Sequence, residues 1–396
     1  MKILQINSFG NMSTGRIAVD LYRTILENDD EGIIAYARNS IAEDVSSIKI
    51  GNKISVYKDG ILTRLTDRAG FYSKKETLHL INNIKKYCPD IIQLHNIHGY
   101  YINVPYLFAF LKEYEKPVVW TLHDCWAFTG HCCYYSMVGC EKWKSQCTEC
   151  MQTHAYPASL FLDKSYENYT FKKETFTTMK NLYLVAVSQW LKNQVKESFL
   201  ASIPCSVIYN GIDTNIFRPT SSFFRRNYDI EDLFIILGVA STWDARKGLE
   251  DFIELSKMLD ETCKIVLVGI DTKRKKLLPD NIIAIERTNN LKELAEIYSA
   301  VDVFFNASVE ETFGLPTVEA ISCGTPAIVY NSTALPEVLD DNTGIIVEKG
   351  NLNKVVNAIE DIRSGRFKFN NITADRFEKR KCFMNYLELY KKIVSE

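Results

Sequence analysis

Residues 308–320 read SVEETFGLPTVEA, and they place two carboxylates, Glu311 and Glu319, on either side of a turn that should begin a helix. Pro316 suits the first position of that helix, where its missing N–H costs nothing. Gly324, followed two residues later by a proline, should end the helix after about two turns. The stretch therefore predicts a turn followed by a short helix.

The start of this helix has the features of a binding site for an anion. Amides there lie at the positive end of the helix dipole, so those of Gly314 and Leu315 can face a diphosphate. Glu319, expected in the first turn, can accept two hydrogen bonds from a cis-diol such as a ribose, and Glu311 can reach a sugar hydroxyl. From spacing alone, a nucleotide-sugar site and an ordinary short helix with a solvated glutamate explain the pattern equally well.

Three segments of the chain resemble a known family. The run SVEETFGLPTVEAISCGTPAIV, in which Glu311 and Glu319 enclose seven residues, resembles the EX7E signature of retaining glycosyltransferases of family 4, which have the GT-B fold. Lys247-Gly248 resembles the family's phosphate-contacting Lys-Gly. Residues 208–213 (IYNGID), with Phe217 and Pro219, resemble its crossover between two domains.

The N-terminal half is most similar to a bacterial branch of this family that builds exopolysaccharides and O-antigens and includes colanic acid glycosyltransferases. The segments that carry this likeness are 13–17 (STGRI), 94–101 (LHNIHGYY) and 121–130 (TLHDCWAFTG). The resemblance therefore runs across most of the chain. It implies transfer of a sugar from a UDP- or GDP-sugar to a growing lipid-linked saccharide.

The pattern of apolar residues agrees with the fold that the resemblance implies. Short apolar runs alternate with amphipathic stretches, which is typical of α/β proteins with parallel sheets. Twelve strands are expected, at 2–6, 32–36, 90–95, 117–123, 182–188, 206–209, 234–240, 264–268, 282–285, 301–305, 327–330 and 344–347. Helices are expected at 16–27, 76–87, 190–198, 248–259, 291–300, 352–363 and 375–394.

We therefore expect two doubly wound, Rossmann-like domains that face each other across a cleft, with ligands bound at the carboxyl ends of the strands. Residues 1–212 form the acceptor-side domain, with a cysteine-rich loop at 124–160. Residues 213–374 form the nucleotide-sugar domain. The boundary is placed in 211–219, because Asn-Gly, Asp and Pro occur together there just after an expected strand. Residues 375–396 form a helix that, in related enzymes, crosses back to the first domain.

Composition limits the partners. A chain of 396 residues is long for one hydrophobic core, and a formal charge of −2 argues against nucleic acid as the main partner. We find no apolar run of the ~18 residues that a membrane span requires, and the apolar part of MKILQINSFG is too short for a signal peptide. The protein is expected to be cytoplasmic, with any membrane contact peripheral, through patches such as Lys74-Lys75, Lys85-Lys86 or Arg225-Arg226.

Donor binding is expected mainly in the second domain. Lys247 would neutralise the departing diphosphate, and Arg246 is an additional cation. The family usually has an arginine five residues before this lysine, where Thr242 stands here. Both cations can also be read as exposed residues at a helix start. In the first domain, Gly15 belongs to a turn whose amides could approach phosphate, although Ser-Thr-Gly before a helix is also an ordinary cap.

Catalysis is assigned from the resemblance to His123, Glu311 and Lys247. His123 ends a strand, and the family places a histidine there beside the donor sugar; a buried, hydrogen-bonded histidine is the alternative. His95 and His98 could line the same cleft or pack in the core. Retention can proceed by front-side attack, in which the leaving phosphate oxygen takes the acceptor proton. Because no Asp-x-Asp motif occurs, no cofactor is expected for catalysis.

Five of the eleven cysteines fall between Cys132 and Cys150. They lie in a connection of almost sixty residues, which requires its own stabiliser. Cys132, Cys140, Cys147 and Cys150 offer enough thiolates for a tetrahedral structural zinc site. The resembling branch has a similar pattern, from which His131 and Cys133 depart. Packed cysteines, a disulfide and an iron–sulfur cluster are the alternatives. The aromatic residues of this loop suggest that it shapes the acceptor side.

Two other functions fit the same residues. A nucleotide-sugar epimerase or hydrolase would share the fold, and so would a non-catalytic nucleotide-sugar-binding protein. Product analysis without an acceptor separates the first from a transferase.

Overall fold

The computed structural model describes residues 1–369 and 372–395 and divides into two compact units. Unit 1 is Met1–Tyr209 together with the chain from Arg380 onward, and unit 2 is Asn210–Lys379. The division thus falls just before the expected boundary at 212, and the final segment joins unit 1 from residue 380 rather than 375. Of the expected segments 213–374 and 375–396, residues 370, 371 and 396 lie outside the described residues.

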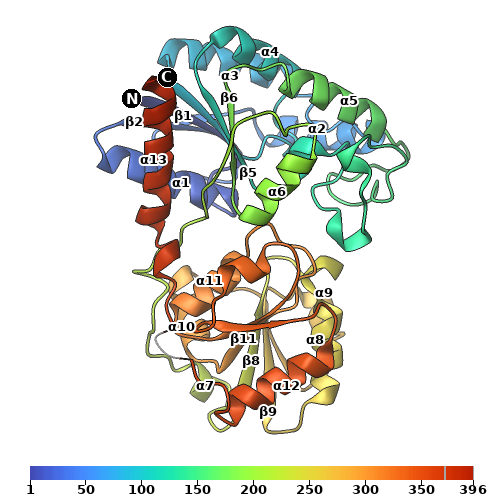
Figure 1. Ribbon diagram of the computed structural model, residues 1–396, viewed down its shortest axis with the longest axis vertical. Coiled ribbons are helices and arrows are strands. Elements are labelled where there is room, and N and C mark those ends of the chain that lie inside the picture. Colours follow the sequence, from blue (N-terminus) through green and yellow to red (C-terminus); the bar gives the residue numbers. More distant parts are fainter. Residues whose placement is uncertain (370–371, 396) are drawn as a thin grey trace. The chain divides into compact units, whose positions relative to one another are not determined.

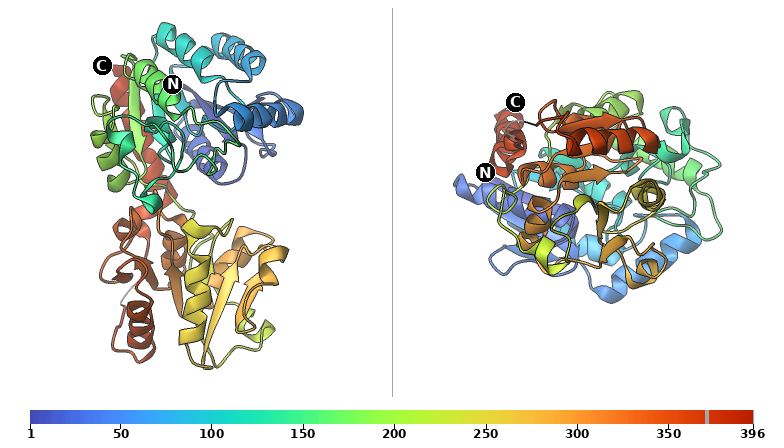
Figure 2. Two further views of the ribbon diagram at one scale, coloured as in Figure 1. Left: turned by 90° about the vertical axis from the view of Figure 1, so that its right-hand side faces the viewer. Right: turned by 90° about the horizontal axis from the view of Figure 1, so that it is seen from below.

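Unit 1 contains a seven-stranded parallel sheet with the order β3-β2-β1-β4-β5-β6-β7 (Figure 1). Every residue of β4 and β5 is buried, because helices lie on both faces of the sheet and leave no solvated side (Figure 2). The strands are β1 (Lys2–Phe9), β2 (Glu31–Arg38), β3 (Ser47–Lys49), β4 (Ile91–Leu94), β5 (Val118–Leu122), β6 (Leu182–Ala186) and β7 (Cys205–Val207). The helices are α1 (Thr14–Glu27), α2 (Lys53–Thr66), α3 (Lys74–Tyr87), α4 (Val104–Tyr114), α5 (Ser165–Phe176) and α6 (Gln189–Glu197).

Unit 2 contains a six-stranded parallel sheet with the order β10-β9-β8-β11-β12-β13. Its strands are β8 (Phe234–Val239), β9 (Cys263–Val268), β10 (Ile282–Ile285), β11 (Val303–Asn306), β12 (Ala327–Tyr330) and β13 (Gly344–Val347). Its helices are α7 (Phe224–Asn227), α8 (Leu249–Met258), α9 (Thr272–Lys275), α10 (Leu291–Ser299), α11 (Leu315–Ser322) and α12 (Leu352–Arg363).

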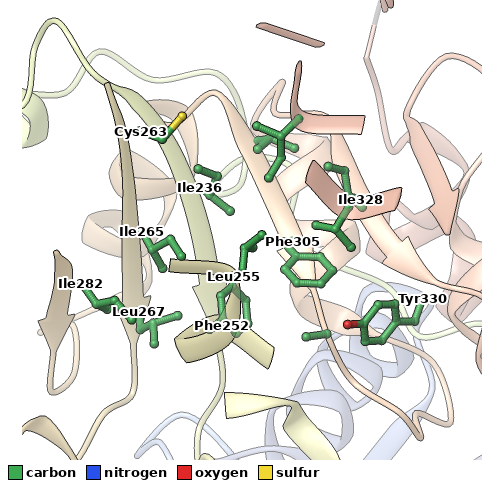
Figure 3. Packing of buried hydrophobic residues seen from close by; sticks show 14 of the residues in the cluster. Ile236, Phe252, Leu255, Cys263, Ile265, Leu267, Ile282, Phe305, Ile328 and Tyr330 are labelled. Carbon is green, nitrogen blue, oxygen red and sulfur yellow. The ribbon is translucent and has the colours of Figure 1, made fainter. Parts of the chain in front are cut away.

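The core of unit 2 packs β11 against α8 and β12. Phe305 lies with its ring centroid 5.1 Å from that of Phe252 and 5.4 Å from that of Tyr330, and all three side chains are buried (Figure 3). The hydroxyl of Tyr330 donates to Asp251 at 2.7 Å, which ties β12 to α8. The loops that follow β8 and β11 are therefore held by packed aromatic residues.

Each sheet has one point at which the strand order reverses: between β1 and β4 in unit 1, and between β8 and β11 in unit 2. In doubly wound sheets, ligands bind beyond the carboxyl ends of the two strands at this point. Binding residues are consequently expected in the loops after β1 and β4, and in those after β8 and β11.

The expected strands all form, with ends that shift by up to three residues, but the sequence did not reveal β3 and several helices. The missed helices are α2, α4, α5, α7 and α9. The single helix expected over 375–394 was wrong, because the chain forms a short 3₁₀ turn at Asp375–Phe377 and then α13 (Lys379–Ser395). Between them, Glu378 adopts extended backbone and pairs with Ile212, so the helix cannot run through.

Helix α13 is part of unit 1 from Arg380 onward. The hydroxyl of Tyr386 lies 3.0 Å from that of Thr121 on β5, and Tyr390 donates to Gln93 on β4 at 2.8 Å. Over residues 1–369 and 372–395, we find no helix that combines the length and apolar content needed to cross a membrane.

Candidate active site

The loop after β8 carries Lys247 to the end of β11. A 3₁₀ turn at Ala245–Lys247 begins at Asp244, whose carboxylate accepts from the Lys247 amide, and Gly248 follows at φ 72°. A Cβ at Gly248 would lie 2.4 Å from the carbonyl oxygen of Ala307, so only glycine lets the turn approach the strand end this closely. The pairing of lysine with glycine thus has a structural reason: the glycine allows the close approach, which places the lysine at the end of β11.

Lys247 and Glu311 form an ion pair with side chains 14% and 12% exposed. Oε1 of Glu311 accepts from Nζ of Lys247 and, at 3.3 Å, from the hydroxyl of Ser308. Arg246 lies 3.9 Å from the other carboxylate oxygen and donates to the carbonyl of Glu310 at 3.0 Å. The structure therefore brings Lys247, Arg246 and Glu311 together, and neither cation is simply an exposed residue.

The charge state of Glu311 follows from these neighbours. Burial alone would raise the pKa of its carboxyl, but the charges of Lys247 and Arg246 and the hydrogen bonds from Lys247 and Ser308 hold this pKa below its ordinary value. The site thus combines two cations with one carboxylate. Its net positive charge favours an anion such as a diphosphate.

Helix α11 begins beside this cluster. Gly314 precedes it at φ 102°, and a Cβ there would lie 2.9 Å from the side chain of Leu335. Leu315 is the first helical residue, so Pro316 occupies the second position, not the first as the sequence suggested. Within the described residues, the amides of Gly314 and Leu315 have no hydrogen-bond acceptor, as expected at a helix start. They are available to an anion.

Glu319 lies deeper than the sequence analysis placed it. Because α11 begins at Leu315, this residue follows the first turn instead of belonging to it. Its side chain is 4% exposed, and one carboxylate oxygen accepts from the hydroxyl of Tyr298 on α10 at 3.2 Å. The reading of Glu319 as a solvated residue was therefore wrong. Tyr298, which positions this carboxylate, was not identified from the sequence.

In unit 1, a chain of hydrogen bonds fixes the orientation of His123, which follows β5. Its Nε2 lies 3.1 Å from Nδ1 of His95, and Nε2 of His95 lies 2.9 Å from Oε1 of Gln5. The amide nitrogen of Gln5 donates to the carbonyl of Ala18, so its oxygen must accept from His95. Nδ1 of His95 then accepts from Nε2–H of His123, and Nδ1 of His123 is left without a proton.

Both histidines are neutral near pH 7. Burial, reinforced by the neighbouring His123, lowers the pKa of His95 well below its ordinary value, and burial lowers the pKa of His123 to about 4. The sequence offered a sugar contact or a buried, hydrogen-bonded histidine for His123; its side chain is half-buried and its Nε2 is hydrogen-bonded, and the sugar contact stays a prediction. In this tautomer the lone pair of the His123 ring lies on Nδ1.

Two further residues, His98 and Asp124, lie near these hydrogen-bonded histidines. His98 lies with Nε2 2.8 Å from a carboxylate oxygen of Asp124, whose other oxygen accepts from the Trp126 amide at 2.9 Å. Burial would raise the pKa of Asp124, but His98 and these hydrogen bonds keep it below its ordinary value. His95, His98, His123 and Asp124 line one small cavity at the ends of β4 and β5.

The turn after β1 differs from the expectation for Gly15. This residue lies inside α1, and its amide donates to the carbonyl of Met12 at 2.8 Å. A Cβ would come 2.8 Å from the carbonyl oxygen of Phe9, so the glycine is needed for close packing. Ser13 makes no capping hydrogen bond, which excludes the ordinary cap as an explanation.

Lys172 stabilises the long connection after β5. It projects from α5, is 2% exposed, and donates to the carbonyls of Trp126 at 2.7 Å and Thr129 at 2.9 Å. Its ammonium lies 3.5 Å from the centroid of the Trp126 ring, and burial lowers the pKa of Lys172 to about 7. The stabiliser that the loop required thus includes a buried lysine that the sequence analysis did not consider.

The four cysteines expected to bind zinc are only partly gathered. A hydrogen bond joins Cys132 and Cys150; with it as the main cause, the pKa of Cys150 falls to about 7. Cys147 accepts from the Gly130 amide at 3.2 Å. Among the described residues, however, the potential metal ligands whose donor atoms all lie within 4.8 Å of one another are His98, Asp124 and Cys133. No three of the four expected cysteines form such a group there.

Some of these residues left a signal in the sequence. Gln5 and Gln93 are buried polar residues in the strands KILQINSF and IIQL, and a polar residue in a buried strand requires a partner. Tyr298 gave no such signal, because a tyrosine on an amphipathic helix is usually a core residue.

Comparison with known proteins identifies the family. A family model described as Glycosyltransferase Family 4 matches residues 51–216, and one described as Glycosyl transferases group 1 matches residues 221–381. The putative colanic acid biosynthesis glycosyl transferase WcaC of Escherichia coli (strain K12) is 24% identical over 369 residues, which are 88% of this chain and 88% of that protein.

Solved structures show the same fold. Sucrose-phosphate synthase from Thermosynechococcus elongatus has a TM-score of 0.74 at 15% identity, covering 100% of this chain and 99% of that one. Anabaena Alr3699/HepE in complex with UDP and glucose has a TM-score of 0.68 at 15% identity, covering 99% of this chain and 100% of that one. The chain is a glycosyltransferase of the GT-B fold and belongs to glycosyltransferase family 4.

Proposed function

We propose that this enzyme transfers a sugar, with retention of configuration, from a UDP- or GDP-sugar to a lipid-linked saccharide during synthesis of a bacterial surface polysaccharide. The observation that carries the donor class is the cluster of Lys247, Arg246 and Glu311 beside the start of α11. The E. coli relative named for colanic acid biosynthesis and the Anabaena structure that contains UDP and glucose support the same donor and pathway class.

The chemistry that these residues can perform is electrostatic. The diphosphate would bind at the amides of Gly314 and Leu315, with Lys247 shared between the phosphates and Glu311. Glu319, held by Tyr298, would accept hydrogen bonds from the ribose hydroxyls. The resemblance to family 4 implies that His123 contacts the transferred sugar. In front-side attack, the leaving phosphate oxygen takes the proton of the acceptor hydroxyl, so none of these residues needs to act as a base.

A transfer assay tests this proposal. The enzyme is incubated with each of several UDP- and GDP-sugars and with lipid-linked mono- and disaccharide acceptors, and products are followed by mass spectrometry and NMR. We expect one donor to yield a product one sugar longer with the anomeric configuration of the donor. Activity that vanishes with EDTA and returns specifically with Mg²⁺ or Mn²⁺ would contradict metal-independent transfer. An inverted product would contradict retention. Rapid release of free sugar without acceptor would indicate a hydrolase, and donor binding without turnover a non-catalytic protein.

We also propose a structural zinc ion in the loop at 124–160, held by Cys132, Cys140, Cys147 and Cys150. The pairing of Cys132 with Cys150 supports it, although the sulfurs would have to move closer together. Metal analysis of protein purified without added zinc should give one equivalent, and Cys150→Ser should lower both zinc content and the melting temperature. Zinc or iron well below one equivalent would remove this proposal.

A further inference from the structure

Helix α2 has its polarity reversed. A helix on a protein surface normally buries its apolar side chains and exposes its polar ones. In α2 the buried residues are Asp59 and Thr63, and the apolar residues Ile54 and Tyr57 are 78% and 73% exposed. Ile61 and Leu65 continue this face at 40% and 43%, with the spacing that places all four on one side of the helix.

The helix is well formed, so its outward apolar face is not the result of a frayed segment. Asn52 caps the helix start and forms a reciprocal capping box with Ser55. On the inner face, the carboxylate of Asp59 accepts from the hydroxyls of Thr63 at 3.2 Å and Ser73 at 2.5 Å. The polar side of α2 is therefore fixed toward the protein, which commits the apolar side to the outside.

The apolar face continues onto the end of the cysteine-rich loop. The amide of Leu160 donates to the carbonyl of Arg64 at 2.8 Å, which fixes this loop at the C-terminal end of α2. Leu160 is 50% exposed, and Phe161 next to it is 82% exposed. We name Ile54, Tyr57, Ile61, Leu65, Leu160 and Phe161 the α2 surface.

The charges on α2 have one sign. Lys53, Lys58 and Arg64 are exposed on this helix, and Asp59, the only acidic residue in its sequence KISVYKDGILTRLT, is buried. An outward apolar stripe with basic residues on the same helix is typical of helices that lie in the interface of a membrane with anionic lipids.

We propose that the α2 surface docks on a bilayer that contains anionic lipids. The apolar side chains enter between the head groups, and Lys53, Lys58 and Arg64 contact lipid phosphates. This inference deepens the proposed function, because a lipid-linked acceptor lies in such a bilayer. It differs from the expectation for Lys74-Lys75, Lys85-Lys86 and Arg225-Arg226, since it combines basic with exposed apolar residues in one place.

Co-sedimentation of the full chain with lipid vesicles tests the proposal. Vesicles of phosphatidylcholine are compared with vesicles in which part of this lipid is replaced by phosphatidylglycerol. One variant combines Ile54→Gln, Tyr57→Gln and Phe161→Ser, a second combines Lys53→Gln and Lys58→Gln, and a matched control combines Phe223→Ser and Leu277→Gln, which are 75% and 79% exposed in unit 2.

We expect the wild type to bind anionic vesicles at least about tenfold more strongly than neutral ones, and either α2 variant to bind at least about tenfold more weakly than the wild type. The control should bind like the wild type. Nucleotide-sugar binding, measured by calorimetry without vesicles, should be unchanged in all variants, which also shows that they are folded. Failure of the docking inference is thereby separated from failure of the proposed donor site.

Three results would overturn the inference: a wild type that does not bind anionic vesicles, an apolar variant that binds as well as the wild type, or equal loss of binding in the control. Analytical ultracentrifugation provides a further decision. A stable dimer that the apolar variant converts to a monomer would assign the α2 surface to contact between two copies of the chain.

Discussion

Replacement of Lys247 by methionine tests the ion pair at the centre of unit 2. The variant keeps the length of the side chain and removes its charge, so Glu311 loses its main partner but keeps Ser308 at 3.3 Å and Arg246 at 3.9 Å. Breaking a fully buried ion pair costs about 3–5 kcal/mol, whereas exposed pairs are worth about 0–1 kcal/mol. With side chains 14% and 12% exposed and one cation remaining, we expect Lys247→Met to cost about 1–3 kcal/mol.

The cost should come from the pair and not from the lysine alone. A double-mutant cycle of Lys247→Met and Glu311→Gln should give a coupling free energy of about 1–2 kcal/mol. Native-state hydrogen exchange with mass spectrometry, read on peptides from 234–258 and 303–322, reports the stability of unit 2 directly. Lys257→Met is the matched control, because its ion pair with Glu254 is 58% exposed on both sides and should be worth less than about 1 kcal/mol.

The same variant should lose activity beyond its loss of stability. If Lys247 also neutralises the leaving diphosphate, kcat/KM should fall by about 100- to 1,000-fold in protein that is fully folded at the assay temperature. A coupling free energy indistinguishable from zero, or a Lys247→Met variant as stable and as active as Lys257→Met, would show that the ion pair has neither role.

Three further predictions concern the loops at the strand ends. Gly248→Ala should destabilise unit 2 by about 1–3 kcal/mol and lower donor affinity, because its Cβ would meet the Ala307 carbonyl at φ 72°; a donor affinity equal to that of Gly350→Ala, at φ 77° with open space around it, would contradict this. Gln5→Leu removes the acceptor that fixes the tautomer of His95, so kcat should fall and Gln5→Glu, which can still accept, should restore part of it; equal kcat for all three proteins would argue against the hydrogen-bond chain. The folded state disfavours protonation of His123, because the pKa of about 4 lies below the usual 6.5, so the free energy of unfolding should fall as pH drops from about 6.5 toward 4. The wild type should therefore lose about 2 kcal/mol more than His123→Asn between pH 7 and pH 5 in thermal melts. Parallel losses in the two proteins would contradict the assignment.

The strands were the most predictable part of this chain. β12 and β13 were located to the residue, because Gly-Thr-Pro and Asn-Thr-Gly mark the starts of their apolar runs. Helix α2 escaped because four of its apolar residues face outward and its two buried residues, Asp59 and Thr63, are polar, which spoils the usual amphipathic pattern. The sequence of α5, SYENYTFKKETF, has no apolar stripe either, and its buried Lys172 would normally be read as exposed.

The site was predictable where one segment carried it. The turn before α11 and the glycine after Lys247 could be identified from local motifs, and their approach to each other follows from the strand order of a doubly wound sheet. The contacts of Glu319 with Tyr298 and of His123 with His95 could not, because they depend on side chains that meet only after the strands and helices have packed.

Calorimetric titration of nucleotide sugars into the wild type and Glu319→Gln shows whether the donor binds at the start of α11. Tyr298→Phe serves as the control, since it removes the partner of Glu319 but leaves its charge. We expect the wild type to bind a UDP- or GDP-sugar, Glu319→Gln to bind it about 10- to 100-fold more weakly through loss of charged hydrogen bonds, and Tyr298→Phe to have a smaller effect. Donor binding by Glu319→Gln with the affinity of the wild type would show that the nucleotide sugar does not bind at the start of α11.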